Sequence, residues 1–149
     1  MTTVSYDNLA SLAGTDLGWS QWRDVTQARI DTFADATDDH QWIHTDPERA
    51  KDGPFGAAVA HGFLTLSLAV AMWTELLDVE GVSAKVNYGL DKVRFISPVL
   101  AGARVRMNAV IAEVVEIPGG YQLVVDQTIE VEGSAKPAVA ARGIYRFYA

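Results

Sequence analysis

The sequence predicts an α+β protein in which helices come first and an antiparallel sheet follows. Residues 61–77 form a long segment whose apolar side chains fall on every side of a helix, which is the pattern of a buried helix. After Gly81 the pattern changes to alternating apolar and polar residues, which is typical of strands with one buried face. Helices followed by a meander of strands define the α+β class.

The first half of the chain is expected to hold short elements. Residues 1–17 carry little pattern, and residues 19–25 are expected to form a short strand with one of its two tryptophans against the core. Thr26 is a plausible N-cap for a helix that ends near Asp38. Pro47 opens a second, short helix, because proline is favoured in the first turn.

The second half is expected to be a meander of long strands. The apolar phase slips between Gly89 and Lys92, which predicts a β-bulge, a feature common beside active sites. Glycine-rich turns separate the later strands. Strands are expected near residues 86–95, 105–111, 121–131 and 138–148, with turns at Gly119-Gly120 and at residues 133–137.

A curved sheet covers only part of a helix that is apolar all round, so a second subunit is expected to cover the rest of helix 61–77. Symmetric pairs are the commonest oligomers. The sequence therefore favours a homodimer.

Length and composition narrow the classes of function. A chain of 149 residues with 49% hydrophobic and 21% charged residues is expected to form one globular domain, residues 1–149. The net charge of −7 disfavours non-specific binding to nucleic acid. No cysteine is present, which excludes a thiol nucleophile. The longest apolar run is too short to span a membrane, and the first residues do not resemble a signal peptide, so a cytoplasmic location is expected.

The sequence lacks the motifs of serine hydrolases, P-loop proteins and Rossmann enzymes. His40 and His44 form an HxxxH pair with His61 further on, which raises the question of a metal site. Gln41 stands where a zinc protease would have its catalytic Glu, and Trp42-Ile43 crowd the centre of the motif. We therefore expect no metal and no redox cofactor.

Asp39 and His44 can together hold one water, with one group accepting its proton while the other orients it. On residue types alone, His44 could equally satisfy a turn and Asp39 could cap the next segment. The surrounding sequence decides between these interpretations.

Three separated blocks resemble the MaoC-like (R)-specific enoyl-CoA hydratases: FADATDDHQWIH (residues 33–44), Phe55-Gly56 and AHGFLTLS (residues 60–67). The later segment VRFISPV (residues 93–99) extends the resemblance over most of the chain. The family pattern has Asn-Pro where this chain has Gln41-Trp42, and the Gln-Trp form resembles the NodN-like branch.

The resemblance implies a hotdog fold, in which a curved antiparallel sheet wraps a long helix, and a dimer with its active sites at the interface. It places the catalytic acid on Asp39, the catalytic histidine on His44 and the oxyanion amide on Gly62. Asp38 lies where the family more often has glycine. Further substrate contacts are expected from Gln41, His61, Asn87 and Tyr88.

The implied reaction is (R)-specific hydration of a trans-2-enoyl-CoA thioester to the (R)-3-hydroxyacyl-CoA. Asp39 and His44 would activate the water, and the Gly62 amide at the helix N-terminus would stabilise the thioester oxyanion. The coenzyme A phosphates would meet cations, for which Lys92, Arg94, Arg104 and Arg106 are available.

Two other functions fit the same fold. An acyl-CoA thioesterase would also place an acid near a helix N-terminus, but such enzymes generally lack the paired Asp39 and His44. A non-catalytic acyl-thioester binding protein would keep the pocket without turnover.

Overall fold

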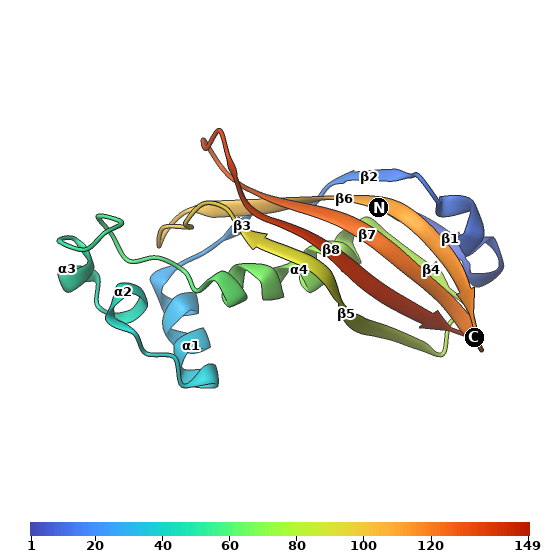
Figure 1. Cartoon of the computed structure of the whole chain (residues 1–149), viewed down its shortest axis with the longest axis horizontal. Helices are drawn as coiled ribbons and strands as arrows, with labels where there is room; N and C mark the ends of the chain where they lie inside the picture. The colour runs from blue at the N-terminus through green and yellow to red at the C-terminus, as the bar shows by residue number, and fades with distance from the viewer.

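The computed structural model describes residues 1–149, and its centre is a helix held against a curved sheet (Figure 1). The sheet wraps α4 along its length, whereas α1, α2 and α3 extend beyond one end. The helices are α1 (Gln27–Thr37), α2 (Trp42–Thr45), α3 (Pro47–Ala50) and α4 (Gly62–Leu76), with a 3-10 helix η1 (Tyr6–Leu12) near the N-terminus. The strands are β1 (Thr2–Ser5), β2 (Asp16–Trp19), β3 (Arg23–Asp24), β4 (Leu77–Glu80), β5 (Ala84–Phe95), β6 (Arg104–Ile117), β7 (Gly120–Val131) and β8 (Pro137–Tyr148).

The main sheet is antiparallel and follows the order β2-β6-β7-β8-β5, with β3 also paired to β6. A separate parallel pair joins β1 to β4. The predicted α+β class, the long helix and the meander of strands are therefore confirmed. No helix has the length and apolar character needed to cross a membrane.

The core lies between α4 and the concave face of the sheet. Met72 of α4 is fully buried, as are the inward-facing Met107 and Ile111 of β6 and Leu123 and Val125 of β7. Alternating apolar residues on these strands place one side chain in two against the helix.

The predicted bulge is confirmed. The pairing of β5 with β8 shifts register twice, between Asn87 and Gly89 and again between Leu90 and Lys92. The sequence analysis did not anticipate a further shift between Ile111 and Glu113 of β6.

The first 25 residues differ from the expectation. Residues 1–17 form β1, η1 and the start of β2, and Leu9 is fully buried. Short strands and 3-10 turns have too few residues to show a periodic pattern. The expected strand over residues 19–25 is split between β2 and β3, with a break at residues 20–22.

Neither tryptophan of this region caps the core. Trp19 is 42% exposed, and the rings of Trp19 and Trp22 both lie 4.5 Å from the Arg106 guanidinium. Both rings pack on the Arg106 guanidinium instead. This cation–π contact stabilises large aromatic rings at the surface.

Helix α4 is not covered on all sides within one chain. Its inner face is buried, but Phe63 is 68% exposed and Val70 is 40% exposed. Neighbouring strand β5 is exposed along nearly its whole length, including Val86, Leu90 and Phe95. One apolar flank of the molecule, formed by α4 and β5, therefore faces outward.

Candidate active site

The turn between α1 and α2 positions both sequence-predicted catalytic residues. Thr26 caps α1 by accepting a hydrogen bond from the Arg29 amide at 3.1 Å, as the sequence predicts. Asp38 ends α1 in the left-handed conformation, with φ of 59°. This reversal turns the chain so that Asp39 precedes the short helix α2, which carries His44.

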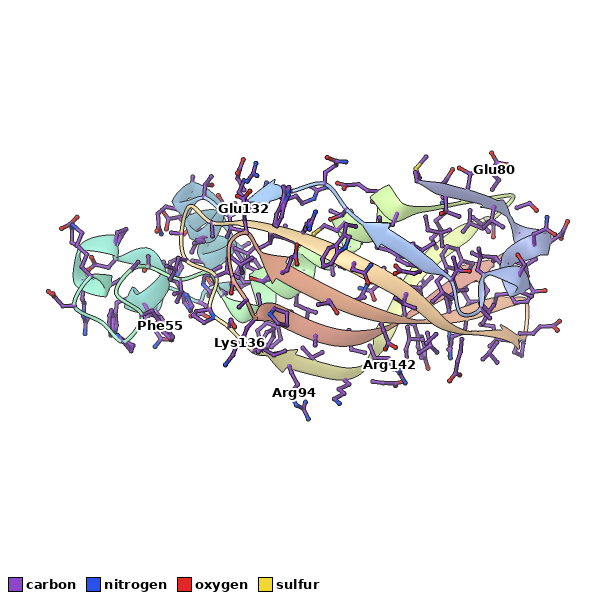
Figure 2. The ribbon with its side chains drawn as sticks, turned by 90° about the horizontal axis from the view of Figure 1, so that it is seen from above. Phe55, Glu80, Arg94, Glu132, Lys136 and Arg142 are labelled. Atoms are coloured by element: carbon purple, nitrogen blue, oxygen red, sulfur yellow. The ribbon has the colours of Figure 1, made fainter.

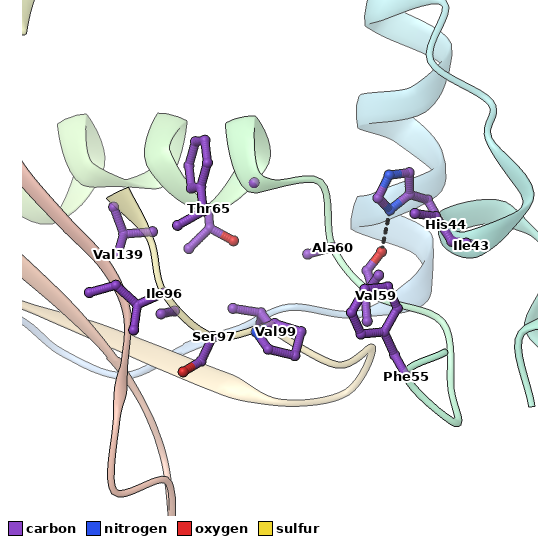
Figure 3. Close-up of a pocket in the computed structure, with 14 residues that line it drawn as sticks. Ile43, His44, Phe55, Val59, Ala60, Thr65, Ile96, Ser97, Val99 and Val139 are labelled. Atoms are coloured by element: carbon purple, nitrogen blue, oxygen red, sulfur yellow. Dashed lines mark hydrogen bonds between the residues drawn. The ribbon is translucent and has the colours of Figure 1, made fainter. Parts of the chain in front are cut away.

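The ring of His44 is buried and oriented by the backbone. Its Nδ1 lies 2.6 Å from the carbonyl oxygen of Val59 (Figure 3). A carbonyl only accepts, so Nδ1 carries the proton and, in the neutral ring, Nε2 holds the free lone pair. The amide of Val59 also donates to the carbonyl of Ile43 at 3.0 Å, which ties α2 to the segment before α4.

His61 joins this turn to the head of α4. It is 3% exposed, and its Nε2 donates to the backbone carbonyl of Asp39 at 2.9 Å. Its ring stacks on His44 with a centroid distance of 3.9 Å and is covered on another side by Phe33 at 4.9 Å. His61 therefore contacts the backbone of Asp39. It does not line the apolar pocket that adjoins His44 and Gly62.

The side chains of Asp39, His44 and His61 converge. Each places one nitrogen or carboxylate oxygen within 4.8 Å of the other two. The Asp39 carboxylate is 53% exposed and lies 4.0 Å from His61 Nε2. The cluster thus combines an open acid with a buried imidazole whose tautomer is fixed by its hydrogen bond.

A metal ion at this cluster would have to compete for both imidazoles, because His44 Nδ1 and His61 Nε2 each hydrogen-bond to a backbone carbonyl. The HxxxH pair is also divided, because His40 turns away and pairs with Asp35 at 2.8 Å. That contact raises the pKa of His40, chiefly because the protonated ring donates a hydrogen bond to the Asp35 carboxylate. The expectation that the site uses no metal stays a prediction.

Gly62 is the first residue of α4, directly after His61. The first amides of a helix have no intrahelical partner and carry the positive end of the helix dipole. A Cβ at Gly62 would lie 3.1 Å from the ring of Phe95, so the glycine permits close packing at this point.

A pocket of about 320 Å³ adjoins His44 and Gly62 (Figure 3). Its walls are largely apolar and come from the segment before α4, the end of β5 and the start of β8. They include Phe55, Thr65, Phe95, Ser97, Val99 and Val139. Phe55 sits in the loop after α3, at the helical end of the molecule (Figure 2). Apolar walls with a few polar groups are typical of small-molecule sites.

The other predicted contacts are not gathered at this pocket within one chain. Gln41 is exposed at the start of α2 and does not line the pocket. Asn87 lines two smaller cavities further along α4. Tyr88 faces outward, with the Arg146 guanidinium 3.3 Å from its ring centroid.

Sequence reasoning missed the contribution of Val59 and of Phe95. The Val59 carbonyl acts through its backbone, which leaves no trace in residue type. Phe95 is the last residue of β5, and its 50% exposure in one chain marks it only once the fold is known.

The fold and the site define the class of protein. Residues 8–133 match the model of the MaoC like domain, and the chain belongs to this family of MaoC-like dehydratases. It is 49% identical over 149 residues to 3-hydroxyacyl-thioester dehydratase Z of Mycobacterium tuberculosis, with 99% of each chain covered. It is 45% identical to nodulation protein N of Rhizobium leguminosarum, with 97% of this chain and 91% of that protein covered. The predicted family and its NodN-like branch are confirmed.

Solved structures confirm the hotdog fold. A protein from Archaeoglobus described as a monoamine oxidase regulatory protein superposes with a TM-score of 0.77 at 27% identity, covering 91% of this chain and 90% of that one. An (R)-hydratase from A. caviae superposes with a TM-score of 0.74 at 21% identity, covering 89% of this chain and 94% of that one. At 21% identity, the similarity to the (R)-hydratase concerns the fold alone.

Proposed function

We propose that this protein, acting as one domain over residues 1–149, catalyses the reversible (R)-specific hydration of trans-2-enoyl-CoA to (R)-3-hydroxyacyl-CoA. The observation that carries the proposal is the fixed tautomer of His44. Its protonated Nδ1 is held by Val59, so Nε2 carries the free lone pair, in a ring that belongs to the Asp39 cluster and lines the same pocket as Gly62. The name of the 3-hydroxyacyl-thioester dehydratase at 49% identity supports the reaction class.

The proposed reaction begins with the activation of one water molecule. His44 Nε2 takes a proton from a water that Asp39 orients, and the water oxygen bonds to C3 of the enoyl group. The C2–C3 double bond becomes single, and charge passes to the thioester oxygen, where the Gly62 amide stabilises it. The proton then moves to C2, which leaves the histidine neutral again. No metal takes part, so dialysis against EDTA should leave the rate unchanged.

The cations of β5 are freer than those of β6 to meet the coenzyme A phosphates. Arg104 and Arg106 of β6 are already engaged, since Arg104 Nε donates to Glu132 at 2.8 Å and Arg106 Nε to Glu130 at 2.6 Å. Lys92 and Arg94 form no ion pair, and Arg94 extends into solvent from β5 (Figure 2). We therefore favour Lys92 and Arg94 for this role.

Exchange of Asp39 for Asn keeps its shape but removes its charge. Turnover of crotonyl-CoA should fall by roughly two to four orders of magnitude, and His44→Ala should fall comparably. The double variant should be scarcely worse than either single one, because groups that act as a unit are non-additive. Initial rates measured at the absorbance of the enoyl thioester give these values.

Asp38→Asn is the matched control. Asp38 is exposed and ends α1, so its charge at the helix C-terminus is unfavourable and its removal should leave turnover unchanged. An inactive Asp38→Asn beside an active Asp39→Asn would contradict the assignment. Release of free coenzyme A as the sole product would identify a thioesterase instead, and folded protein that binds without turnover would identify a binding protein.

Gly62→Ala should lower turnover by about a hundredfold, or about 3 kcal/mol of transition-state stabilisation, while the protein still folds. The added methyl would meet both the Phe95 ring, at 3.1 Å, and a thioester lying against the amide. Comparing Gly62→Ala with Gly62→Ala/Phe95→Leu separates these effects. Recovery of the rate in the double variant would assign the loss to crowding by Phe95 and remove Gly62 from the oxyanion site.

We further propose that two chains form a homodimer through the flank of α4 and β5. Strand β5 is a long, exposed edge of the sheet, and such edges pair with a further strand unless they are protected. Phe63 and Val70 on α4 extend the same apolar surface. A partner on this flank would cover the helix face that one chain leaves open.

Sedimentation should report about twice the chain mass of 16.2 kDa. Val86→Lys, on β5, should shift the protein toward monomer. Val115→Lys, on β6, is the matched control, because the two valines are 41% and 43% exposed. A fully active wild-type monomer would overturn the proposal.

A further inference from the structure

Strand β7 breaks its apolar alternation at Gln127. Its inward-facing neighbours Val125 and Ile129 are fully buried aliphatic residues, whereas Gln127 occupies the same face with 3% exposure. A buried amide on the helix side of the sheet needs hydrogen-bond partners.

Only part of that requirement is met by the protein. Gln127 Nε2 donates to the Tyr145 hydroxyl at 2.7 Å, and this is the one hydrogen bond made by either side chain. The hydroxyl proton of Tyr145 and the Oε1 of Gln127 have no protein partner. One donor and one acceptor therefore remain side by side.

The pair is held in place on several sides. The ring of Tyr145 stacks on Trp73 of α4, with centroids 4.7 Å apart and planes 14° apart. Gly143 makes room for both groups, since a Cβ there would lie 3.0 Å from Gln127 Oε1 and 3.0 Å from the Tyr145 ring. Burial raises the pKa of Tyr145, and the hydrogen bond from Gln127 opposes that shift, so the phenol keeps its proton near neutral pH.

Both side chains line a cavity of about 230 Å³ between α4 and the sheet, whose other walls include Leu66, Val70, Asn87 and Leu90. A neighbouring cavity of about 210 Å³ shares Val70, Asn87 and Tyr145. We refer to these two cavities as the α4–β5 seam.

The seam lies further along α4 than the candidate catalytic pocket, and the two share no lining residue. Gly62 and Thr65 of α4 line that pocket, and Leu66 and Val70 line the seam. At 1.5 Å per helical residue, the seam begins roughly 6 to 12 Å beyond the Gly62 amide. An acyl chain whose thioester lies at Gly62 can therefore extend toward Gln127.

We infer that the α4–β5 seam binds the distal part of an acyl chain that carries a hydroxyl group. The hydroxyl donates to Gln127 Oε1 and accepts from the Tyr145 hydroxyl, while the chain packs against Leu66, Val70 and Leu90. This inference rests on the proposed acyl-thioester function and adds a preference among acyl chains. A water molecule bound between the two groups is the alternative occupant.

Binding of saturated acyl-CoAs tests the inference without relying on turnover. Isothermal titration of the wild-type protein compares the affinities of octanoyl-, decanoyl- and dodecanoyl-CoA with those of their ω-hydroxy counterparts. Each increase in chain length moves the terminal hydroxyl further along the seam. At one chain length the ω-hydroxy compound should bind about tenfold more tightly, the effect of one or two neutral hydrogen bonds.

Two variants remove the polar groups while keeping their size. Gln127→Met and Tyr145→Phe should each abolish the preference for the hydroxyl while still binding the plain acyl-CoA. Thr128→Val, which changes the opposite face of β7, is the control and should keep the preference.

Equal affinity for plain and hydroxylated chains at every length would overturn the inference and leave the proposed function intact, with water as the occupant. A preference that survives in both variants would also overturn it. If no acyl-CoA binds at all, the proposed function fails together with the inference.

Discussion

The site depends on one hydrogen bond, between Nδ1 of His44 and the carbonyl oxygen of Val59 at 2.6 Å. It fixes which ring nitrogen carries the proton, and it holds the ring where Asp39 and the head of α4 meet. The amide of the next residue, Ala60, donates to Val99 at 2.8 Å, so this segment is anchored to the far side of the pocket as well. Loss of this anchoring would free the imidazole and separate it from Gly62.

The fold serves this arrangement by making α4 the shared wall of the pocket and the core. The helix begins at Gly62, where its amides open onto the pocket, and continues through the fully buried Met72. Its stability comes from packing against the sheet, whereas its first turn remains available for a ligand. The exposed flank formed with β5 is the part of the helix that the fold alone leaves uncovered.

The sequence predicted the elements with strong local signals. Helix α4, the cap at Thr26, the bulge between Gly89 and Lys92 and the strand meander all follow from periodicity and turn residues. The N-terminal η1 and β2 were missed because they are too short for periodicity. Gln127 was missed because one polar residue in an alternating strand has no meaning until its facing partner, Tyr145, is known.

In the candidate site, too, the sequence predicted some features and missed others. Asp39, His44 and Gly62 lie on sequence blocks with family spacing, and the structure brings Asp39 and His44 together. The contacts of Val59 with His44 and of His61 with the Asp39 carbonyl involve backbone atoms, which no residue type reveals.

The stereochemistry of the product tests the central claim most directly. Chiral analysis of the 3-hydroxybutyryl-CoA formed from crotonyl-CoA should find the (R) isomer in large excess, whereas a predominantly (S) product would contradict the account.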